Sequence, residues 1–527
     1  MPRRFRPKAC RIYAIYRVSH VALYLLIFLL WACPPVLAFN LPSNKKKRLA
    51  SLHLGQQQKT SLDHVVSART VAIDAMRKSS STAFVIDKLD ALLSQSNLSG
   101  RDRSFARLLI TTCVRRLGQI DRVLEMCENK KPKNEKGRKQ RRLNETDRLV
   151  QAVLRMGAVQ LLFLAVPPHA AVKESVDVLR MSRELQVPEA KIKYVNAVLR
   201  RIGREGGDLL AKTDITDNAA DWFVQELTKS YGPEAAHGVI QSAMIESPRC
   251  LTVKHSPDDT VAEQREKLDS LASCFEDSII LPQGSLMVVS PPPGKISGWP
   301  LYDQGEWWLQ DVSATLPAIA LHNTLGQRES PNQQNVVDLC AAPGGKTAQL
   351  CNFGYNVTAV ELSSRRSKRL HENMDRLGFD CQIIVADGSE WIPQMPVHGV
   401  LLDAPCTATG TGSKRPDVLR KPGDYKELLD IQFKLLCHAA DDVLTAGGIL
   451  AYATCSLLSQ ESEAQIQKLL SRESSTRMRT LPFQPGEIPG FDDCIDTNGW
   501  LRIVPGSRPR ALKHVDGFFV ARLEKEA

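Results

Sequence analysis

The sequence lacks the patterns that would assign it at once to several large classes of protein. None of its thirteen cysteines forms a Cys-x-x-Cys pair, which argues against a structural zinc site, and their spacing does not resemble a disulfide framework. A Gly-x-Gly-x-x-Gly motif is absent, and Cys340 occupies the position where a P-loop ending at Gly345-Lys346 needs its first glycine. With 43% hydrophobic and 24% charged residues, the composition is otherwise that of an ordinary globular protein.

Acidic residues are absent from the start of the chain. Residues 1–60 contain eleven Lys and Arg but no Asp or Glu, whereas the remainder holds 58 basic and 58 acidic residues. The formal net charge of +11 therefore belongs to the N-terminal segment and does not by itself indicate RNA binding. A local candidate is the segment 130–142, with eight Lys and Arg and one Glu, which is either a phosphate contact or a solvated, mobile loop.

The first 60 residues are predicted to be a targeting leader. Basic side chains precede an apolar run, Val21–Cys33, whose thirteen residues are too few for a comfortable bilayer span. Pro34-Pro35 and a small residue, Ala38, follow it, so residues 1–38 have the order of a signal peptide. Residues 39–60 are rich in Lys, Ser and Gln, as in a transit peptide. The two parts resemble the bipartite leader of algae with secondary plastids and predict a place in the chloroplast stroma; secretion and a type II membrane anchor are the alternatives.

Residues 61–205 are predicted to be an all-α domain. Apolar residues such as Leu149 and Val153 recur every three to four positions, and Ser99 offers a helix N-cap. Three segments in this order resemble the NusB-type RNA-binding helical domain, namely Ser99–Ala106, Val166–Val176 and Tyr194–Arg200. Within them, His169 and Asn196 are expected to cap and pack helices instead of contacting RNA.

Residues 206–310 are predicted to form a small α+β subdomain. Residues 221–231 have the pattern of a short amphipathic helix that ends at Gly232, and residues 249–253 that of a strand. Trp307 and Trp308 could stack on bases, or they could be buried aromatic residues.

Strands and helices alternate in residues 311–527, which predicts a Rossmann-like, doubly wound α/β domain with ligands at the carboxyl ends of its strands. The predicted strands are 335–339, 356–361, 382–386, 399–402, 447–454 and 515–522. The predicted helices are 346–351, 363–377, 425–445 and 459–471. The third helix carries one apolar stripe, formed by Leu428, Ile431, Leu435, Ala439 and Val443.

A tight turn and three acids follow successive predicted strands. The turn after the first strand is Cys340-Ala341-Ala342-Pro343-Gly344-Gly345-Lys346. Its glycines let backbone N–H groups approach a ligand and leave a helix N-terminus beside it. Glu361, Asp387 and Asp403 end the next three strands, where Glu361 can accept from ribose hydroxyls and Asp387 from an adenine amine. Each acid alone could be a helix cap, but the series favours S-adenosylmethionine over a polyphosphate, which the three charges would repel.

Two cysteines, Cys406 and Cys455, also follow strands of this sheet. Any single cysteine is more often an inert core thiol. Together, however, two thiols and Asp403 at neighbouring strand ends suggest covalent chemistry on cytosine, in which a thiolate adds to C6 and so makes C5 nucleophilic. Such thiols must stay reduced, which favours a plastid stroma over an oxidising secretory lumen.

The motifs of the α/β domain resemble the Sun family of RNA cytosine-5 methyltransferases. They are Asp338 to Lys346, Val360-Glu361-Leu362, Ala386-Asp387-Gly388, Asp403-Ala404-Pro405-Cys406 with Gly410, Thr454-Cys455-Ser456 and Asp516-Gly517-Phe518-Phe519. With a NusB-like domain in front, the similarity covers roughly residues 61–523 and is greatest to the bacterial small-subunit rRNA methyltransferases B. Thr407 stands where serine is usual, and Arg415 stands where histidine is frequent.

The resemblance implies a role for each candidate residue. Cys340 to Lys346, Glu361, Asp387 and Asp403 would bind S-adenosylmethionine. Cys455 would be the nucleophile, Cys406 would assist product release as the base at C5, and Asp403 would also stabilise the protonated N3.

We therefore predict an S-adenosylmethionine-dependent methyltransferase that acts, without a metal and as a monomer, on C5 of a cytidine in small-subunit rRNA, either naked or in an early assembly particle. The alternatives are a non-catalytic RNA-binding assembly factor, methylation of tRNA or another RNA, and a DNA cytosine methyltransferase, in which Cys406 would be the nucleophile.

Overall fold

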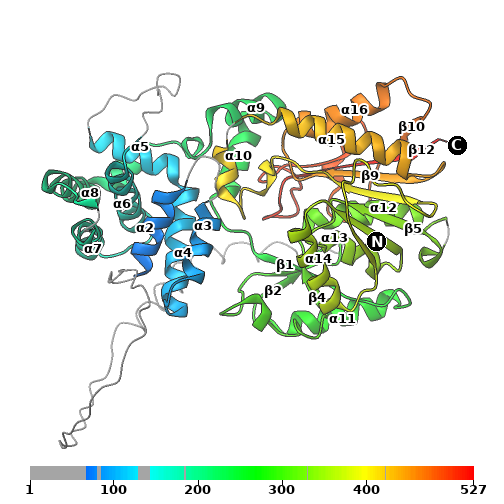
Figure 1. Cartoon of the computed structure of the whole chain (residues 1–527), viewed down its shortest axis with the longest axis horizontal. Helices are drawn as coiled ribbons and strands as arrows, with labels where there is room; N and C mark the ends of the chain where they lie inside the picture. The colour runs from blue at the N-terminus through cyan, green and yellow to red at the C-terminus, as the bar shows by residue number, and fades with distance from the viewer. Residues whose placement is uncertain are drawn as a thin grey trace, which may run out of the picture. The chain divides into compact units, whose positions relative to one another are not determined.

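The computed structural model describes residues 67–79, 85–128, 143–182, 185–328, 330–421 and 423–526 (Figure 1). The predicted leader and the basic segment 130–142 lie outside these residues. In the described part of the chain, no helix combines the length and the apolar character that crossing a bilayer requires.

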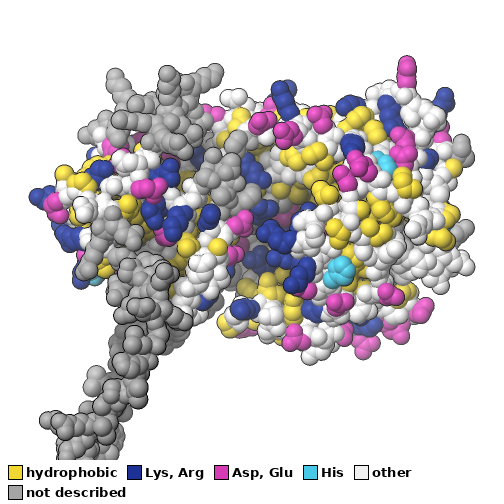
Figure 2. Space-filling model, in the orientation of Figure 1, with side chains coloured by type: hydrophobic (Ala, Val, Ile, Leu, Met, Phe, Trp, Pro, Cys, Tyr) yellow, Lys and Arg dark blue, Asp and Glu magenta, His cyan; other side chains and the backbone are white. Residues whose placement is uncertain are grey.

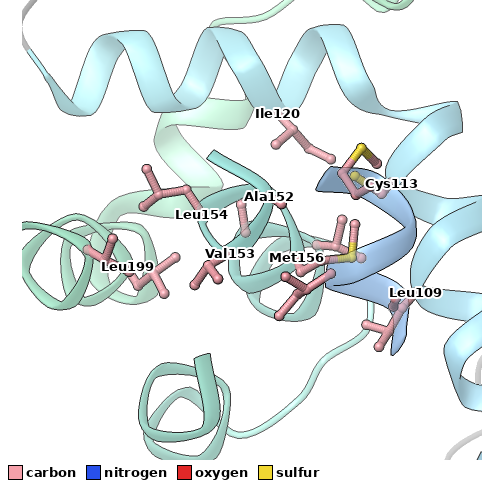
Figure 3. Packing of buried hydrophobic residues seen from close by; sticks show 14 of the residues in the cluster. Leu109, Cys113, Ile120, Ala152, Val153, Leu154, Met156 and Leu199 are labelled. Atoms are coloured by element: carbon pink, nitrogen blue, oxygen red, sulfur yellow. The ribbon is translucent and has the colours of Figure 1, made fainter. Parts of the chain in front are cut away.

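The first part of the described chain is helical, as predicted. Its helices are α2 (Ala68–Lys78), α3 (Val85–Ser94), α4 (Gly100–Arg115), α5 (Leu117–Cys127), α6 (Glu145–Leu162), α7 (Pro168–Met181) and α8 (Glu189–Leu210). The Ser99 side chain caps α4 by accepting from the backbone N–H of Asp102. Apolar side chains of α4, α5 and α8 pack around α6 in one core (Figure 3). Helices α6 and α8 approach closely at Gly157, where a Cβ would lie 2.6 Å from the Leu199 side chain.

His169 and Asn196, which belong to the NusB-like motifs, differ in how deeply their side chains are buried. His169 is exposed on the first turn of α7, so the expected packing role is wrong for it. Asn196 is half-buried, and its Oδ1 accepts from Arg200 Nε at 3.3 Å on the same helix.

Two helices and a small sheet connect this bundle to the α/β domain. Helix α9 (Asp221–Tyr231) ends at Gly232, as predicted, and α10 (Pro233–Ala243) follows. Strands β1 (Arg249–Val253), β2 (Ser278–Ile280), β3 (Leu286–Val288) and β4 (Trp307–Leu309) form an antiparallel sheet in the order β2-β3-β1-β4, with α11 (Val261–Ser273) beside it. Trp307 and Trp308 are 0% and 4% exposed, which confirms the buried alternative for both.

The α/β domain contains an eight-stranded sheet. Its strands are β5 (Asn335–Leu339), β6 (Asn356–Glu361), β7 (Gln382–Val385), β8 (Gly399–Asp403), β9 (Ile449–Thr454), β10 (Met478–Thr480), β11 (Leu501–Ile503) and β12 (Phe518–Lys525). The order is β10-β12-β9-β8-β5-β6-β7, and β11 also pairs with β12. Strands β5 to β9 are parallel to their neighbours, whereas β12 runs antiparallel to β9.

Helices cover both faces of this sheet, which confirms the Rossmann-like fold class. They are α12 (Val312–Leu325), α13 (Gly345–Asn352), α14 (Ser364–Leu377), α15 (Lys426–His438) and α16 (Glu463–Ser471). Successive strand residues point to opposite faces. Val336 accordingly packs in the cluster that includes α12, and Val337 in the cluster that includes α15 and α16. The carboxyl ends of β5, β6, β7 and β8 therefore meet at one edge, where the predicted site lies.

Several element predictions differ from the structure. The last strand begins at Phe518 instead of residue 515, and the helix predicted for 425–445 ends at His438, followed by a π-helical turn at Ala439–Val443. In its predicted apolar stripe, Ile431 is 48% exposed, because the buried face runs through Gln432 and Leu435.

Candidate active site

The turn after β5 has the geometry of a ligand-binding loop. Cys340 and Gly344 have φ values of 63° and 102°, and α13 begins at the next residue, Gly345. A Cβ at Gly344 would lie 2.4 Å from the Leu370 side chain on α14, so only glycine fits there. The unpaired N–H groups of the first turn of α13 are therefore presented at the edge of the sheet. Burial raises the pKa of the Cys340 thiol to about 12, so it stays neutral.

Glu361 at the end of β6 is bonded to this turn. Its buried carboxylate accepts from the backbone N–H of Ala342 at 3.2 Å and of Ser363 at 3.0 Å, and it pairs with Arg366 at 3.4 Å. Asp387, in contrast, is exposed after β7 and accepts from the backbone and hydroxyl of Ser389, bonds that lower the pKa of Asp387. The structure thus joins Glu361 to the turn directly, while Asp387 shares only the same edge of the sheet.

Lys346 and Asp403 form an ion pair between the turn and the end of β8. The Lys346 Nζ donates to Asp403 Oδ2 at 2.6 Å, and it lies 5.5 Å from the centre of the Phe518 ring. Burial opposes the charge on Lys346, but the attraction of Asp403 outweighs it, so the pKa of Lys346 is raised. Lys346 was predicted to belong to the cofactor-binding turn. Its bond to Asp403 shows that it also holds in place the carboxylate that was predicted to contact N3 of the target base.

A second acid lies beneath the turn. Asp338 on β5 is fully buried, and its Oδ2 accepts from Thr347 Oγ1 at 2.6 Å. Its other oxygen has no hydrogen-bond partner within the described ranges. Burial raises the pKa of Asp338 to about 7.

The two predicted thiols meet. Strands β8 and β9 are parallel neighbours, and Asp403 lies opposite Ala453 in their register. The Sγ atoms of Cys406 and Cys455, one loop beyond each strand, are 3.5 Å apart. Contact with Cys455, then burial, raises the pKa of Cys406. Cys406 therefore keeps its proton beside the sulfur of Cys455.

A buried carboxylate that was not predicted from the sequence holds both thiol loops. Glu461 accepts from the backbone N–H and the hydroxyl of Thr407 at 2.9 and 2.6 Å, and from Gln432 Nε2 at 3.0 Å. It also accepts from the hydroxyl of Ser456, next to Cys455. In the sequence it resembles an ordinary acid near the start of a predicted helix, and only its burial reveals the role. Thr407, noted as a departure from the family, bonds to Glu461 and is buried.

A third set of contacts joins the loop after Cys406 to the segment that precedes β12. Lys414 bonds to Asp311 and to Asp516, the latter at 2.9 Å. Burial and the neighbouring Asp311 raise the pKa of Asp516 to about 6. The next residue, Gly517, donates its N–H to Gly410 O at 2.8 Å, and a Cβ on Gly410 would lie 2.2 Å from Gly517 O. The loop that carries Cys406 therefore packs directly on the segment before β12.

A cleft of about 480 Å³ opens beside the turn. Besides Asp403 and the residues from Cys340 to Lys346, its lining includes Tyr302, Trp308, Arg369, Asn373 and Arg376. The described residues contain no cluster of His, Cys, Asp and Glu side chains that could hold a metal ion.

The chain is similar to known proteins along most of its length. Residues 327–524 match the family described as 16S rRNA methyltransferase RsmB/F, and residues 66–204 match the NusB family. The ribosomal RNA small subunit methyltransferase B of Shewanella oneidensis is 30% identical over 440 residues, which cover 81% of this chain and 92% of that protein. The protein of the same description from Sodalis glossinidius is 30% identical over 477 residues, or 88% of this chain and 97% of that protein.

Among solved structures, the protein PH0851 superposes with a TM-score of 0.62 at 21% identity, covering 87% of this chain and 99% of that chain. At this level of identity the likeness supports the fold.

Proposed function

The chain belongs to the family of ribosomal RNA small subunit methyltransferases B, and from that premise we propose that it methylates C5 of a cytidine in small-subunit rRNA through a covalent adduct. It is an RNA methyltransferase that uses S-adenosylmethionine. The observation that carries the proposal is the pair of thiols 3.5 Å apart beside Asp403. A nucleic-acid nitrogen or oxygen can attack a methyl group directly, whereas C5 of cytosine needs a thiolate on C6 to become nucleophilic.

The residues at the turn fit S-adenosylmethionine. Gly344 has no Cβ and can therefore pack against Leu370 at a φ of 102°, a turn that presents the first backbone N–H groups of α13 to a ligand. Glu361 can accept from ribose hydroxyls, and the exposed Asp387 from an adenine amino group. When bound, the cofactor supplies an electrophilic methyl group.

Cys455 is the residue that we assign as the nucleophile. Its thiolate would add to C6 of the cytosine, and the electrons of the C5–C6 double bond would then form the new bond from C5 to the methyl carbon, whose bond to the sulfonium sulfur would break with the neutral thioether as leaving group. Asp403 accepts a hydrogen bond from the protonated N3, and its ion pair with Lys346 holds the carboxylate in place.

Cys406 is the residue that we assign to product release. The leading cause of its raised pKa is the contact with Cys455, so Cys406 keeps its proton in the resting site and can donate it in a hydrogen bond to the Cys455 sulfur. Once Cys455 is bonded to C6, that contact no longer favours the protonated form, and Cys406 can give its proton to solvent. It then takes the proton from C5, the C6–S bond breaks, and Cys455 leaves as a thiolate.

We also propose that the protein acts in a plastid stroma, as a monomer, on rRNA that is naked or in an early assembly particle. The two-part leader in the sequence and the need for reduced thiols support the compartment.

The test is methylation of small-subunit rRNA by the purified protein with S-adenosylmethionine labelled in its methyl group. We expect the label in 5-methylcytidine after nuclease digestion, and bisulfite sequencing of organelle rRNA with and without the protein then locates the site. Label in an N- or O-methylated nucleoside contradicts the C5 assignment, and cofactor binding without any transfer contradicts catalysis on this RNA.

A further inference from the structure

We propose that the exposed basic face of α14 binds the ribose–phosphate backbone of single-stranded RNA next to the target cytidine. This inference rests on the proposed function. The first half of the helix carries four exposed cations, Arg365, Arg366, Lys368 and Arg369. Figure 2 shows Lys and Arg side chains gathered over the segment that Figure 1 labels α14.

Helix stability does not explain these cations. The N-terminus of a helix carries a partial positive charge, so acidic residues are favourable there and basic residues are not. The first turn of α14 nevertheless contains Arg365 and Arg366 and no acid. An anionic ligand removes this electrostatic conflict.

Three of the four cations are available for a ligand. Arg366 is engaged, because it pairs with Glu361 and donates to Ala342 O at 2.6 Å. Within the described ranges, the side chains of Arg365, Lys368 and Arg369 make no hydrogen bond or ion pair.

The basic face leads into the cleft of about 480 Å³ beside the turn. Residues 365, 369, 373 and 376 are spaced by four, four and three positions, so they share one side of the helix. Arg369, Asn373 and Arg376 line the cleft together with Lys346 and Asp403. Asn373 is fixed by a bond to Pro343 O at 2.8 Å, and Arg376 by a bond to Tyr302 O at 2.9 Å. A strand bound along α14 would therefore reach the carboxylate assigned to the target base.

The cleft borders both the cofactor turn and the basic face of α14. The turn from Cys340 to Lys346 and Asp403 line it, whereas Glu361 and Asp387, the acids assigned to the ribose and the adenine, do not. On the side of α14 the wall combines the cations Arg369 and Arg376 with the half-buried ring of Tyr302. Cations that follow a backbone beside aromatic side chains are typical of grooves for single-stranded nucleic acid.

The experiment compares the full chain with its R365A/K368A/R369A variant on a small-subunit rRNA fragment. Each phosphate contact contributes about 0.7 to the dependence of log affinity on log salt, so the slope should fall by about 2. We expect RNA affinity to fall by at least about tenfold at low salt, with kcat at saturating RNA, S-adenosylmethionine affinity and melting temperature unchanged.

The matched control is K229A/K426A/R510A, which removes three exposed cations elsewhere and should keep the wild-type slope. The R365K/R369K variant should also keep most of the affinity, because phosphates accept lysine as a point charge. An unchanged salt slope in the alanine variant overturns the proposal. So does a parallel loss of S-adenosylmethionine affinity, which would assign α14 to the cofactor, or a defect only with ribosomal protein present, which would assign it to a protein partner. Failure of the wild-type protein to methylate any RNA is a separate result and overturns the proposed function itself.

Discussion

The sulfur atoms of Cys406 and Cys455 lie 3.5 Å apart, although 49 residues separate them in the sequence. Parallel pairing of β8 and β9 brings the two loops together. The raised pKa of Cys406 makes the two sulfurs chemically different, so removal of each should stop the reaction at a different step.

Replacing Cys455 with alanine should lower turnover by at least about 10⁴-fold, because the variant lacks the thiol assigned to form the bond to C6. Affinity for S-adenosylmethionine should not change, since the residues assigned to it are elsewhere. Label transfer and calorimetric titration measure the two quantities. Continued formation of 5-methylcytidine would move the nucleophile to another residue.

Replacing Cys406 with alanine should leave addition to C6 intact and block release. We expect a covalent protein–RNA complex that survives a denaturing gel and contains methylated cytosine. The C406A/C455A double variant is the control and should form none. A complex formed by C455A alone, through Cys406, would instead support the order of attack found in DNA cytosine methyltransferases.

Replacing Glu461 with glutamine should loosen both thiol loops, because an amide cannot accept all the hydrogen bonds that reach the carboxylate from Thr407 and Ser456. Losing one buried hydrogen bond lowers the free energy of unfolding by about 1–3 kcal/mol. Misplaced thiols should lower kcat by about 10- to 100-fold, with cofactor affinity unchanged. Urea denaturation and steady-state kinetics give both values.

Two changes at Thr407 separate the hydrogen bond from the size of the side chain. Thr407→Ser keeps the hydroxyl that donates to Glu461 at 2.6 Å and should resemble the wild type. Thr407→Val removes the hydroxyl and should share the kcat defect of the Glu461 variant. Equal activity of the two would show that this bond does not position Cys406.

Replacing Gly344 with alanine should weaken cofactor binding. The new Cβ would lie 2.4 Å from Leu370 at a φ of 102°, and a left-handed conformation costs a non-glycine residue roughly 1–2 kcal/mol. Gly345→Ala is the control, because a Cβ there would lie 3.7 Å from the Gln310 side chain, an ordinary contact distance. Titration with S-adenosylmethionine should separate the variants, and equal affinities would mean that the turn tolerates a side chain at residue 344.

Replacing Asp338 with asparagine should change how stability depends on pH. Burial raises the pKa of Asp338 to about 7, whereas an unfolded aspartate titrates near pH 3.9, about its ordinary pKa. Between these values the folded protein binds more protons than the unfolded chain, so the free energy of unfolding falls as pH rises. The difference in free energy of unfolding between the wild type and D338N should therefore decrease as pH rises between these two pKa values, by up to about 4 kcal/mol in all. A flat difference would show that the carboxyl group titrates normally.

The positions of the turn, the acids and the thiols were predictable because each follows a strand whose apolar run is evident in the sequence. Sheet order then brings Cys406 and Cys455 together without any further information. Glu461 was not predictable in this way, because its partners Thr407 and Ser456 come from different loops and its burial depends on tertiary packing.

Helix α12 was missed for a related reason. Its apolar residues do not gather on one face, so it has no periodic stripe, and it contains Pro317, a residue that normally interrupts helices. Strands β10 and β11 have only three residues each, and their assignment depends on pairing with β12. Local sequence patterns cannot detect such pairing.

The position of β12 between β9 and β10 has a consequence for biosynthesis. Six residue pairs join β9, the strand before Cys455, to β12. While a ribosome is still making residues 455–518, β9 has no partner on that side and is an exposed edge. The helical bundle buries its own core with residues 68–209 and can fold earlier. A nascent or truncated chain that lacks β12 should therefore have a folded N-terminal domain and no catalytic activity.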